Sequence, residues 1–279
     1  MNLSVVKDSN GKVLNYVALF SDITKIKNSK NNKKLTMITA YDALFSKLFA
    51  EIADMILVGD SLNMSFAGKA DTLSATLEQM IYHTNAVCAG APKAFVILDM
   101  PFGTYINKNE ALKNAVEVYR QTKAAAIKIE GGADRADIIE HLTSNSIAVM
   151  GHIGLMPQYV RSEGGYKVRG KNKEDEEQLI KDAIAVEKAG AFTIVVEGVM
   201  SDVAKKITEA VNVPIIGIGA GNVTDGQVLV WSDMLGFFED FKPKFVRHYM
   251  QGASMVKEAI NQYRSDVQDS SFPSKEEEY

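Results

Sequence analysis

Short apolar runs, rich in β-branched residues, alternate along this chain with longer segments of helical spacing. Such alternation predicts parallel strands joined by right-handed helical crossovers. Eight runs read as strands, the last of them the weakest: 35–39, 55–58, 94–98, 125–129, 147–150, 192–196, 214–218 and 233–237. Between them, segments such as 75–87 and 177–189 place their apolar residues on one helical face.

Eight strand–helix units close naturally into a (β/α)8 barrel, the TIM-barrel fold. With 279 residues, of which 46% are hydrophobic, the chain is long enough to bury the core of such a barrel. An open doubly wound sheet also has fully buried strands, so periodicity alone leaves it as an alternative. The count of eight and the positions of the polar residues described below favour the barrel.

The composition excludes several classes of protein. The formal net charge is −4 and no cluster of Lys and Arg is dense enough to follow a phosphate backbone, so we expect no nucleic-acid partner. No stretch approaches the roughly 20 consecutive apolar residues of a membrane-spanning helix. The first residues lack an apolar run followed by a cleavage site, and Cys88 is the only cysteine. We therefore expect a cytoplasmic protein without an intrachain disulfide.

Both ends of the chain lie outside the barrel pattern. Residues 1–30 read as a hairpin with its turn at Asn10-Gly11, followed by a connector rich in Lys and Asn; the segment 8–27 also resembles the end of a PAS sensor domain. A lone hairpin adds little core, so we expect residues 1–22 to be dispensable for chemistry. The catalytic barrel is assigned to 31–264, and the polar segment 265–279 is expected to be a frayed tail.

Ionisable residues follow five successive apolar runs. In a parallel barrel, catalytic groups come from the carboxyl ends of the strands, because the loops at that face converge over the barrel mouth. The residues at these ends are Asp60 and Ser61, Asp99, Lys128 and Glu130, His152, and Glu197. A single polar residue after a strand is often only a helix cap, but this succession predicts a shared site.

Other polar residues have a structural explanation. Asp42 precedes a helical run and reads as its N-cap, and His83 lies in a helical segment and reads as a structural hydrogen-bonding group. The acidic run 174–177 suits the positive end of a helix dipole. The three glycines of 217–221 end the seventh run, where many barrels bind phosphate, but close backbone packing explains them equally well.

The candidate site suits metal-assisted enolisation. Carboxylates without cysteine ligands favour a hard cation such as Mg²⁺, and the sequence lacks zinc motifs and the G-x-S-x-G elbow of serine hydrolases. A metal with open positions can chelate the carboxylate and keto oxygens of a 2-oxo acid and acidify the neighbouring C–H. Lys128 would add positive charge where the enolate oxygen develops, and Glu197 is best placed to take the proton.

Eight segments, in order, resemble those of the ketopantoate hydroxymethyltransferase family: TAYDALFSKLF, LVGDSLNM, TLEQMIYHT, LDMPFGTY, IKIEGG, GHIGLMPQ, GGYKVRG and PIIGIGAGNVTDGQVLV. The resemblance implies a (β/α)8 barrel of the phosphoenolpyruvate/pyruvate type with bound Mg²⁺. It implies transfer of a hydroxymethyl group from 5,10-methylenetetrahydrofolate to 3-methyl-2-oxobutanoate, which gives 2-dehydropantoate in pantothenate synthesis. It also implies a homo-oligomer, usually a decamer in this family.

The family pattern assigns roles to individual positions. The metal-binding acids match Asp60 and Asp99, with Glu130 as a further ligand, directly or through water. The substrate contacts match Asp60, Ser61, Asp99 and Lys128. The proton acceptor matches Glu197, and His152 falls near the pocket without a defined role.

Two positions depart from the family pattern. Asn63 stands where the family commonly has Gly, and Met200 stands where it commonly has Pro. Neither replaces a reacting group, so both bear on loop geometry rather than on activity. The PAS-like extension is foreign to the family.

Two other functions stay open on the sequence. A C–C lyase similar to phosphoenolpyruvate mutase or 2-methylisocitrate lyase would share the metal and the enolate but would not use folate. A non-catalytic barrel serving as a binding or sensor protein would be expected to have lost Glu197 or the metal-binding acids, and all of them are present.

Overall fold

The computed structural model describes residues 23–239 and 242–279. These form two compact units, one ending at Val228 and the other spanning Leu229–Tyr279. The predicted barrel range, 31–264, therefore includes much of the second unit. The predicted N-terminal hairpin and most of the PAS-like segment lie outside the described residues.

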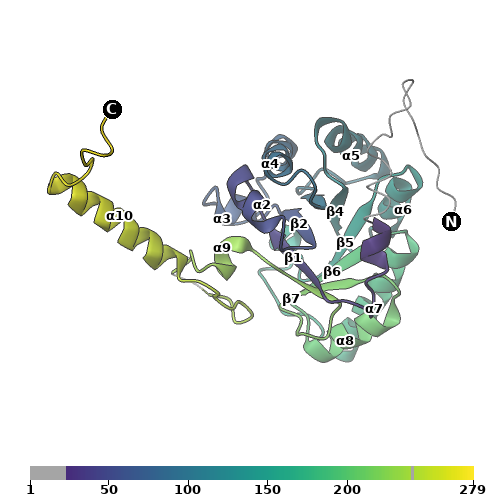
Figure 1. The fold of residues 1–279 in the computed structure, drawn as a ribbon. Coiled ribbons are helices and arrows are strands. Elements are labelled where there is room, and N and C mark those ends of the chain that lie inside the picture. The colour runs from purple at the N-terminus through teal and green to yellow at the C-terminus, as the bar shows by residue number, and fades with distance from the viewer. Residues whose placement is uncertain (1–22, 240–241) are drawn as a thin grey trace, which may run out of the picture. The chain divides into compact units, whose positions relative to one another are not determined.

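Eight parallel strands close into a barrel in chain order (Figure 1). They are β1 (Leu35–Thr39), β2 (Met55–Val58), β3 (Val96–Asp99), β4 (Ala126–Glu130), β5 (Val149–Gly154), β6 (Thr193–Glu197), β7 (Ile215–Ile218) and β8 (Gly226–Leu229). The backbone N–H of Leu35 donates to the carbonyl oxygen of Asp225 at 2.8 Å, which joins the first strand to the last. The predicted (β/α)8 barrel is confirmed, and the open sheet is excluded.

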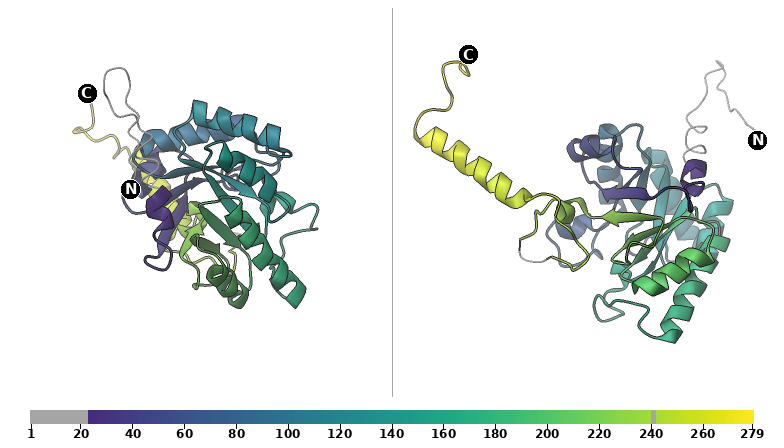
Figure 2. Two further views of the ribbon diagram at one scale, coloured as in Figure 1. Left: turned by 90° about the vertical axis from the view of Figure 1, so that its right-hand side faces the viewer. Right: turned by 60° about the horizontal axis from the view of Figure 1, so that its bottom comes forward.

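Helices cover the outside of these strands (Figure 2). They are α2 (Ala43–Phe49), α3 (Leu62–Ser65), α4 (Leu77–Gly90), α5 (Lys108–Gln121), α6 (Ala136–Ser144), α7 (Lys173–Lys188) and α8 (Ser201–Ala210), with a short 3-10 helix η1 (Pro157–Tyr159) after β5. The predicted segments 75–87 and 177–189 correspond to α4 and α7. The Asp42 carboxylate accepts from the N–H of Phe45 at 2.9 Å, which confirms it as an N-cap.

The prediction of the eighth strand at 233–237 is wrong. The observed β8 contains Gly226 and the exposed Gln227, so its apolar signal is weak. Gly226 packs so closely that a Cβ there would lie 2.6 Å from the carbonyl oxygen of Leu35. The apolar residues of 233–237 instead belong to α9 (Trp231–Met234) and to the turn after it, where Gly236 has a φ of +70°.

The second unit contains a long helix, α10 (Gly252–Gln268). The predicted frayed tail from residue 265 is therefore partly wrong, because its first residues continue this helix. Within the ranges 23–239 and 242–279, no helix combines the length and the apolar character needed to cross a membrane.

The barrel interior is filled by alternate strand residues, because successive side chains of a strand point to opposite faces. Its apolar layers include Met37, Leu57, Ile97, Ala126, Met150, Val195 and Ile216. Two residues further along, the same inward-facing series becomes polar on four neighbouring strands: Asp99 follows Ile97, Lys128 follows Ala126, His152 follows Met150, and Glu197 follows Val195. The strand period thus aims the predicted site residues into the barrel mouth.

Residues before β1 are packed against the barrel. Ile26 is 5% exposed and belongs to the apolar cluster of the core. The Lys30 ammonium lies 2.8 Å from a carboxylate oxygen of Asp225 and donates to the carbonyl oxygen of Thr208 at 2.7 Å. The same carboxylate accepts from the N–H of Ile215 at 2.9 Å. Barrel packing therefore begins before residue 31, where the sequence placed the boundary.

Asp225→Ala should lower the free energy of unfolding by about 3–5 kcal/mol, because it leaves the buried Lys30 ammonium without its counter-charge. Glu177→Ala is the control, since it breaks an exposed ion pair with Lys173 and should change stability by no more than about 0.5 kcal/mol. Urea unfolding of both variants measures the difference. Equal stabilities would show that the Lys30–Asp225 pair does not anchor the segment before β1.

Candidate active site

The six ionisable residues predicted from the strand ends lie in one connected group. Their connections cross five neighbouring strands or strand ends, from β6 to β2, at the carboxyl end of the barrel. Asp60, Asp99, Lys128, Glu130 and His152 are each at most 3% exposed. The side chain of Glu197 is 20% exposed, so this end of the row is open to solvent.

Lys128 is the centre of the row. Its ammonium lies 2.6 Å from one Asp99 oxygen and 3.5 Å from one Glu130 oxygen. Asp99 and Lys128 are register partners on β3 and β4, and Glu130 lies two residues beyond Lys128 on the same face. The strand pairing thus places one positive charge between two buried carboxylates.

His152 connects Lys128 and Glu130 to Glu197. Its Nδ1 lies 3.2 Å from the Lys128 ammonium and 3.4 Å from Glu130, and its Nε2 lies 3.3 Å from Glu197. Glu130 and His152 are register partners on β4 and β5. His152 is therefore a connecting member of the row, which gives a place to a residue whose role the sequence did not define.

Asp60 lies just after the end of β2, and two contacts hold it in place. Its backbone N–H donates to an Asp99 oxygen at 3.3 Å, and its carboxylate accepts from the side-chain amide of Gln158 at 2.9 Å. The backbone N–H of Gln158 donates to Glu130 at 3.0 Å. Gln158 thus connects Asp60 to Glu130 across the mouth.

Ser61 is held by a separate hydroxyl network. Its Oγ lies 2.9 Å from the Tyr41 hydroxyl, and the Ser65 hydroxyl donates to Tyr41 at 3.2 Å. Tyr41 is 1% exposed and directly precedes the N-cap of α2. The loops after β1 and β2 therefore fix the direction of the Ser61 hydroxyl.

The burial of these charges changes their acidity. Burial, the charge of Asp99 and that of Glu130 raise the pKa of Asp60 well above its ordinary value. Burial also raises the pKa of Asp99, although Lys128 opposes the change. For Glu130, burial is outweighed by Lys128 and His152, which lower its pKa.

The basic members of the row are held in their charged forms. Burial opposes the charge of Lys128, but the carboxylates of Asp99 and Glu130 outweigh it and raise its pKa. Burial and the charge of Lys128 oppose protonation of His152, but Glu130 and Glu197 outweigh them and raise its pKa to about 9.

The donor set fits a hard divalent cation. The carboxyl groups of Asp60, Asp99, Glu130 and Glu197 supply oxygen ligands, and a bound cation would favour the ionised forms of Asp60 and Asp99, whose pKa values burial raises. Among the described residues, no group of three or more His, Cys, Asp and Glu side chains is placed to hold a metal ion. A site for Mg²⁺ would thus rest on one or two carboxylates, completed by water and substrate.

The residues given a structural explanation behave as predicted. His83 is 9% exposed, and its Nδ1 lies 2.7 Å from the carbonyl oxygen of Tyr41. The acidic run lies in the first turn of α7, but Asp175 does more than begin a helix, since it forms a two-pronged contact with Arg169. Close packing accounts for Gly217, where a Cβ would lie 2.7 Å from the Thr224 hydroxyl.

Sequence reasoning missed Gln158 and Tyr105. The Tyr105 hydroxyl donates to the side-chain oxygen of Gln158 at 2.5 Å, and both are buried beside the acids. Both lie in segments that resemble the family, GHIGLMPQ and LDMPFGTY. Neither residue ends a strand, so a search for polar residues at the strand ends could not find them. Asn63, which differs from the family pattern, stabilises the loop after α3, because its side-chain amide donates to the carbonyl oxygen of Asp71 at 2.7 Å.

Comparison with known proteins places this geometry in context. A family model described as ketopantoate hydroxymethyltransferase matches residues 20–275. The 3-methyl-2-oxobutanoate hydroxymethyltransferase of Aliarcobacter butzleri is 86% identical over 258 residues, which cover 92% of this chain and 96% of that protein. The enzyme of the same name from a Nitratiruptor species is 64% identical over 257 residues, which cover 92% of this chain and 98% of that protein.

Solved structures share the fold at low sequence identity. A 2,3-dimethylmalate lyase of the PEP mutase/isocitrate lyase superfamily matches with a TM-score of 0.59 and 15% identity, covering 92% of this chain and 89% of that chain. The match confirms the predicted (β/α)8 barrel fold.

In the metal-free protein, the His152 imidazole should stay protonated through neutral pH and titrate near pH 9. Because its folded pKa is raised above the ordinary 6.5, its contribution to stability is complete below pH 6.5 and is lost as the pH rises through about 9. NMR titration of labelled histidine measures this value. Glu197→Gln should lower it, because the substitution removes a carboxylate 3.3 Å from Nε2.

The control for this titration is Glu209→Gln, an exposed glutamate near the end of α8, at the opposite end of the barrel. It should leave the His152 titration unchanged. A His152 that titrates near its ordinary pKa, or that responds equally to both variants, would contradict the assigned contact with Glu197.

Proposed function

The chain belongs to the ketopantoate hydroxymethyltransferase family, and from this premise we propose that it transfers a hydroxymethyl group from 5,10-methylenetetrahydrofolate to 3-methyl-2-oxobutanoate. The product would be 2-dehydropantoate, an intermediate of pantothenate biosynthesis. The observation that carries the proposal is the row of charged side chains from Glu197 to Asp60, which joins a solvent-accessible carboxylate to a buried acidic pair.

Mg²⁺ is the proposed metal, with Asp60 and Asp99 as its direct ligands and Glu130 acting through water. When bound, it would polarise the keto group and acidify the C3–H of the oxo acid. The contacts of Glu130 with Lys128, His152 and the N–H of Gln158 fix the direction of its carboxylate beside the two aspartates.

Lys128, Ser61 and the two aspartates are the proposed substrate contacts. The Lys128 ammonium is held in its charged form and is fixed against Asp99, so its charge is already in place when the enolate oxygen develops. The Ser61 hydroxyl, oriented by Tyr41, can donate to a carboxylate or keto oxygen of the oxo acid.

Glu197 is the proposed base. Its carboxylate is the most exposed of the row, and its contact with His152 orients it. Water would add to the methylene carbon of the donor and break both of its C–N bonds, which releases tetrahydrofolate and leaves that carbon as formaldehyde. Glu197 would take the C3 proton, and the electron pair left on C3 would form the bond to the formaldehyde carbon, whose oxygen takes up a proton and becomes the hydroxyl group.

Self-association is also proposed, through the second unit. Four exposed apolar residues recur on α10 at alternating intervals of four, three and four: Val256, Ile260, Tyr263 and Val267. Such spacing places them along one face, and an exposed apolar stripe of this kind favours a helical partner. This supports a homo-oligomer; the decamer of the family and the cytoplasmic location stay predictions.

The alternative functions have weaker support. A lyase activity rests on fold similarity at 15% identity, which carries no information on the reaction. A non-catalytic sensor is disfavoured because every predicted ionisable residue of the site is present and connected in the row.

Glu197→Gln should slow the exchange of the C3 hydrogen of 3-methyl-2-oxobutanoate with D₂O by about 10² to 10⁴, because the amide cannot accept the proton. The exchange is measured by NMR with Mg²⁺ and without folate. Glu163→Gln is the matched control, since that glutamate pairs with Arg169 outside the row. Equal exchange in wild type and Glu197→Gln would remove Glu197 from the base role and leave His152 as the next candidate.

Asp99→Asn should weaken Mg²⁺-dependent binding of the oxo acid by at least about tenfold, because it removes a charged oxygen ligand. Calorimetric titration with and without Mg²⁺ measures the change. Asp71→Asn, which removes an acid paired with Arg161 outside the row, should bind normally. Unchanged metal and oxo-acid affinity in a folded Asp99→Asn protein would refute the assignment.

A further inference from the structure

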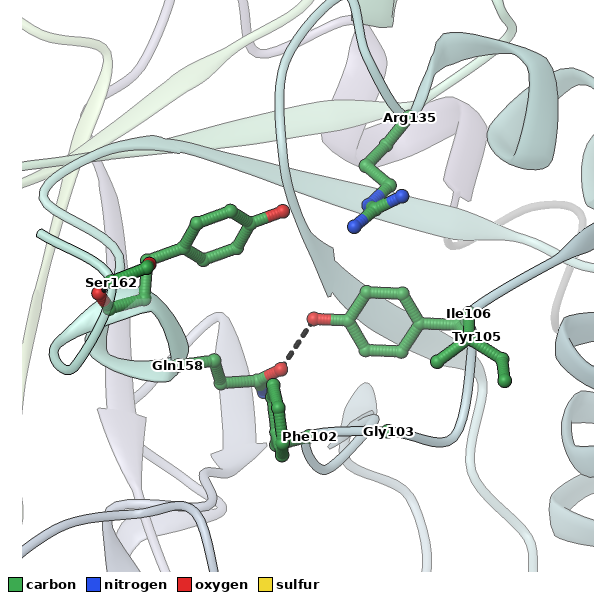
Figure 3. A pocket seen from close by; sticks show the side chains of 8 residues that line it. Phe102, Gly103, Tyr105, Ile106, Arg135, Gln158 and Ser162 are labelled. Atoms are coloured by element: carbon green, nitrogen blue, oxygen red, sulfur yellow. Dashed lines mark hydrogen bonds between the residues drawn. The ribbon is translucent and has the colours of Figure 1, made fainter.

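A cavity of ≈ 150 Å³ adjoins the row of charged side chains through Gln158, which hydrogen-bonds to Asp60. Figure 3 shows the side chains that line this cavity. It is lined by Phe102, Gly103, Tyr105, Ile106, Arg135, Gln158, Tyr159 and Ser162. These residues belong to the connections after β3, β4 and β5, so the cavity lies at the carboxyl end of the barrel, where barrel enzymes bind their substrates.

The inner wall of the cavity touches the acidic group. In Figure 3 the Tyr105 hydroxyl and the Gln158 amide point toward each other and meet in a hydrogen bond of 2.5 Å. The same amide donates to the Asp60 carboxylate at 2.9 Å. Only the Gln158 side chain would therefore lie between a ligand in the cavity and Asp60, which is proposed to bind both the metal and the oxo acid.

The walls are mostly apolar and aromatic. Phe102 and Ile106 remain 54% and 65% exposed beside it, so they offer apolar surface to a ligand. Whole drug-sized ligands occupy pockets of roughly 300–1,000 Å³, so this cavity is large enough for one ring system of such a ligand.

Two buried polar atoms belong to residues that line the cavity, Nε of Arg135 and the hydroxyl oxygen of Tyr159. The Arg135 and Tyr159 side chains interact with each other, and Arg135 Nε lies 3.7 Å from a carboxylate oxygen of Asp134, so a ligand would use the hydrogen-bonding capacity that these contacts leave. The two side chains are neighbours, and the Arg135 guanidinium points toward Tyr105 in Figure 3. An N–H donor beside a hydroxyl that can donate or accept matches the edge of a planar heterocycle that carries a carbonyl next to a ring N–H.

We propose that this cavity binds the pterin ring of the tetrahydrofolate donor. The inference rests on the proposed function, which requires such a donor within reach of the oxo acid. Phe102 and Tyr105 supply aromatic contact to the ring, and Arg135 and Tyr159 hydrogen-bond to its polar edge. The aminobenzoylglutamate part of the donor then extends outward past the exposed Phe102 and Ile106.

Binding of tetrahydrofolate and of its fragments tests the assignment. Calorimetric titrations use tetrahydrofolate, 6-methyltetrahydropterin and p-aminobenzoylglutamate with wild type, Arg135→Met and Tyr159→Phe. The control is Arg161→Met, which removes an equally charged side chain from the loop after β5 but outside the cavity. Circular dichroism melting identifies any variant that fails to fold. If Arg135→Met does not fold, Tyr159→Phe still tests ligand binding in the cavity.

Arg135→Met should raise the Kd of tetrahydrofolate and of the pterin fragment at least about tenfold, whereas Arg161→Met should change either by less than about threefold. Binding of p-aminobenzoylglutamate should be unaffected. Unchanged tetrahydrofolate affinity in folded Arg135→Met and Tyr159→Phe proteins would overturn the proposal, and so would a loss confined to p-aminobenzoylglutamate.

The proposed function is tested separately by wild-type C3 exchange, which needs no folate. If wild type exchanges the C3 hydrogen and binds tetrahydrofolate, but the cavity variants bind it normally, only the pterin site is wrong. If wild type neither exchanges the hydrogen nor binds tetrahydrofolate, the proposed function fails, and the cavity assignment fails with it.

Discussion

The site depends on the ion pairs that the buried ammonium group of Lys128 forms with two carboxylates. The ammonium lies 2.6 Å from Asp99 and 3.5 Å from Glu130, within a barrel mouth where isolated charges would be very costly to bury. With His152 it offsets part of the acidic charge of the site. The same arrangement places a fixed positive charge where the proposed reaction would form an enolate.

The fold makes this arrangement possible by a simple geometric rule. The inward-facing positions of the strands are apolar through the barrel and become ionisable only at the carboxyl ends, so the core below the site excludes water. Register pairing between neighbouring strands then sets Asp99 against Lys128, and Glu130 against His152. A shift of one residue in either register would turn these side chains away from the mouth.

The loops complete what the strands begin. Gln158, on the 3-10 helix after β5, connects Asp60 to Glu130 and also forms the wall of the neighbouring cavity. Tyr41 orients Ser61, and Asn63 holds the loop after α3. The geometry of the barrel mouth therefore depends on a few polar contacts between loops, supported by the strands.

The sequence by itself determined the barrel class and seven of the eight strands, because buried parallel strands are continuous apolar runs. It also determined the six ionisable residues of the row, because the residue at the end of each apolar run can be read directly from the sequence. It failed at β8, whose Gly226 and Gln227 weaken the apolar signal, and at Gln158 and Tyr105, which lie in loops. Only the tertiary structure decided that His152 joins Lys128 to Glu197 and that Arg135 and Tyr159 meet at one cavity. Such contacts join residues far apart in the chain, and strand register and loop path, rather than local composition, set their distances.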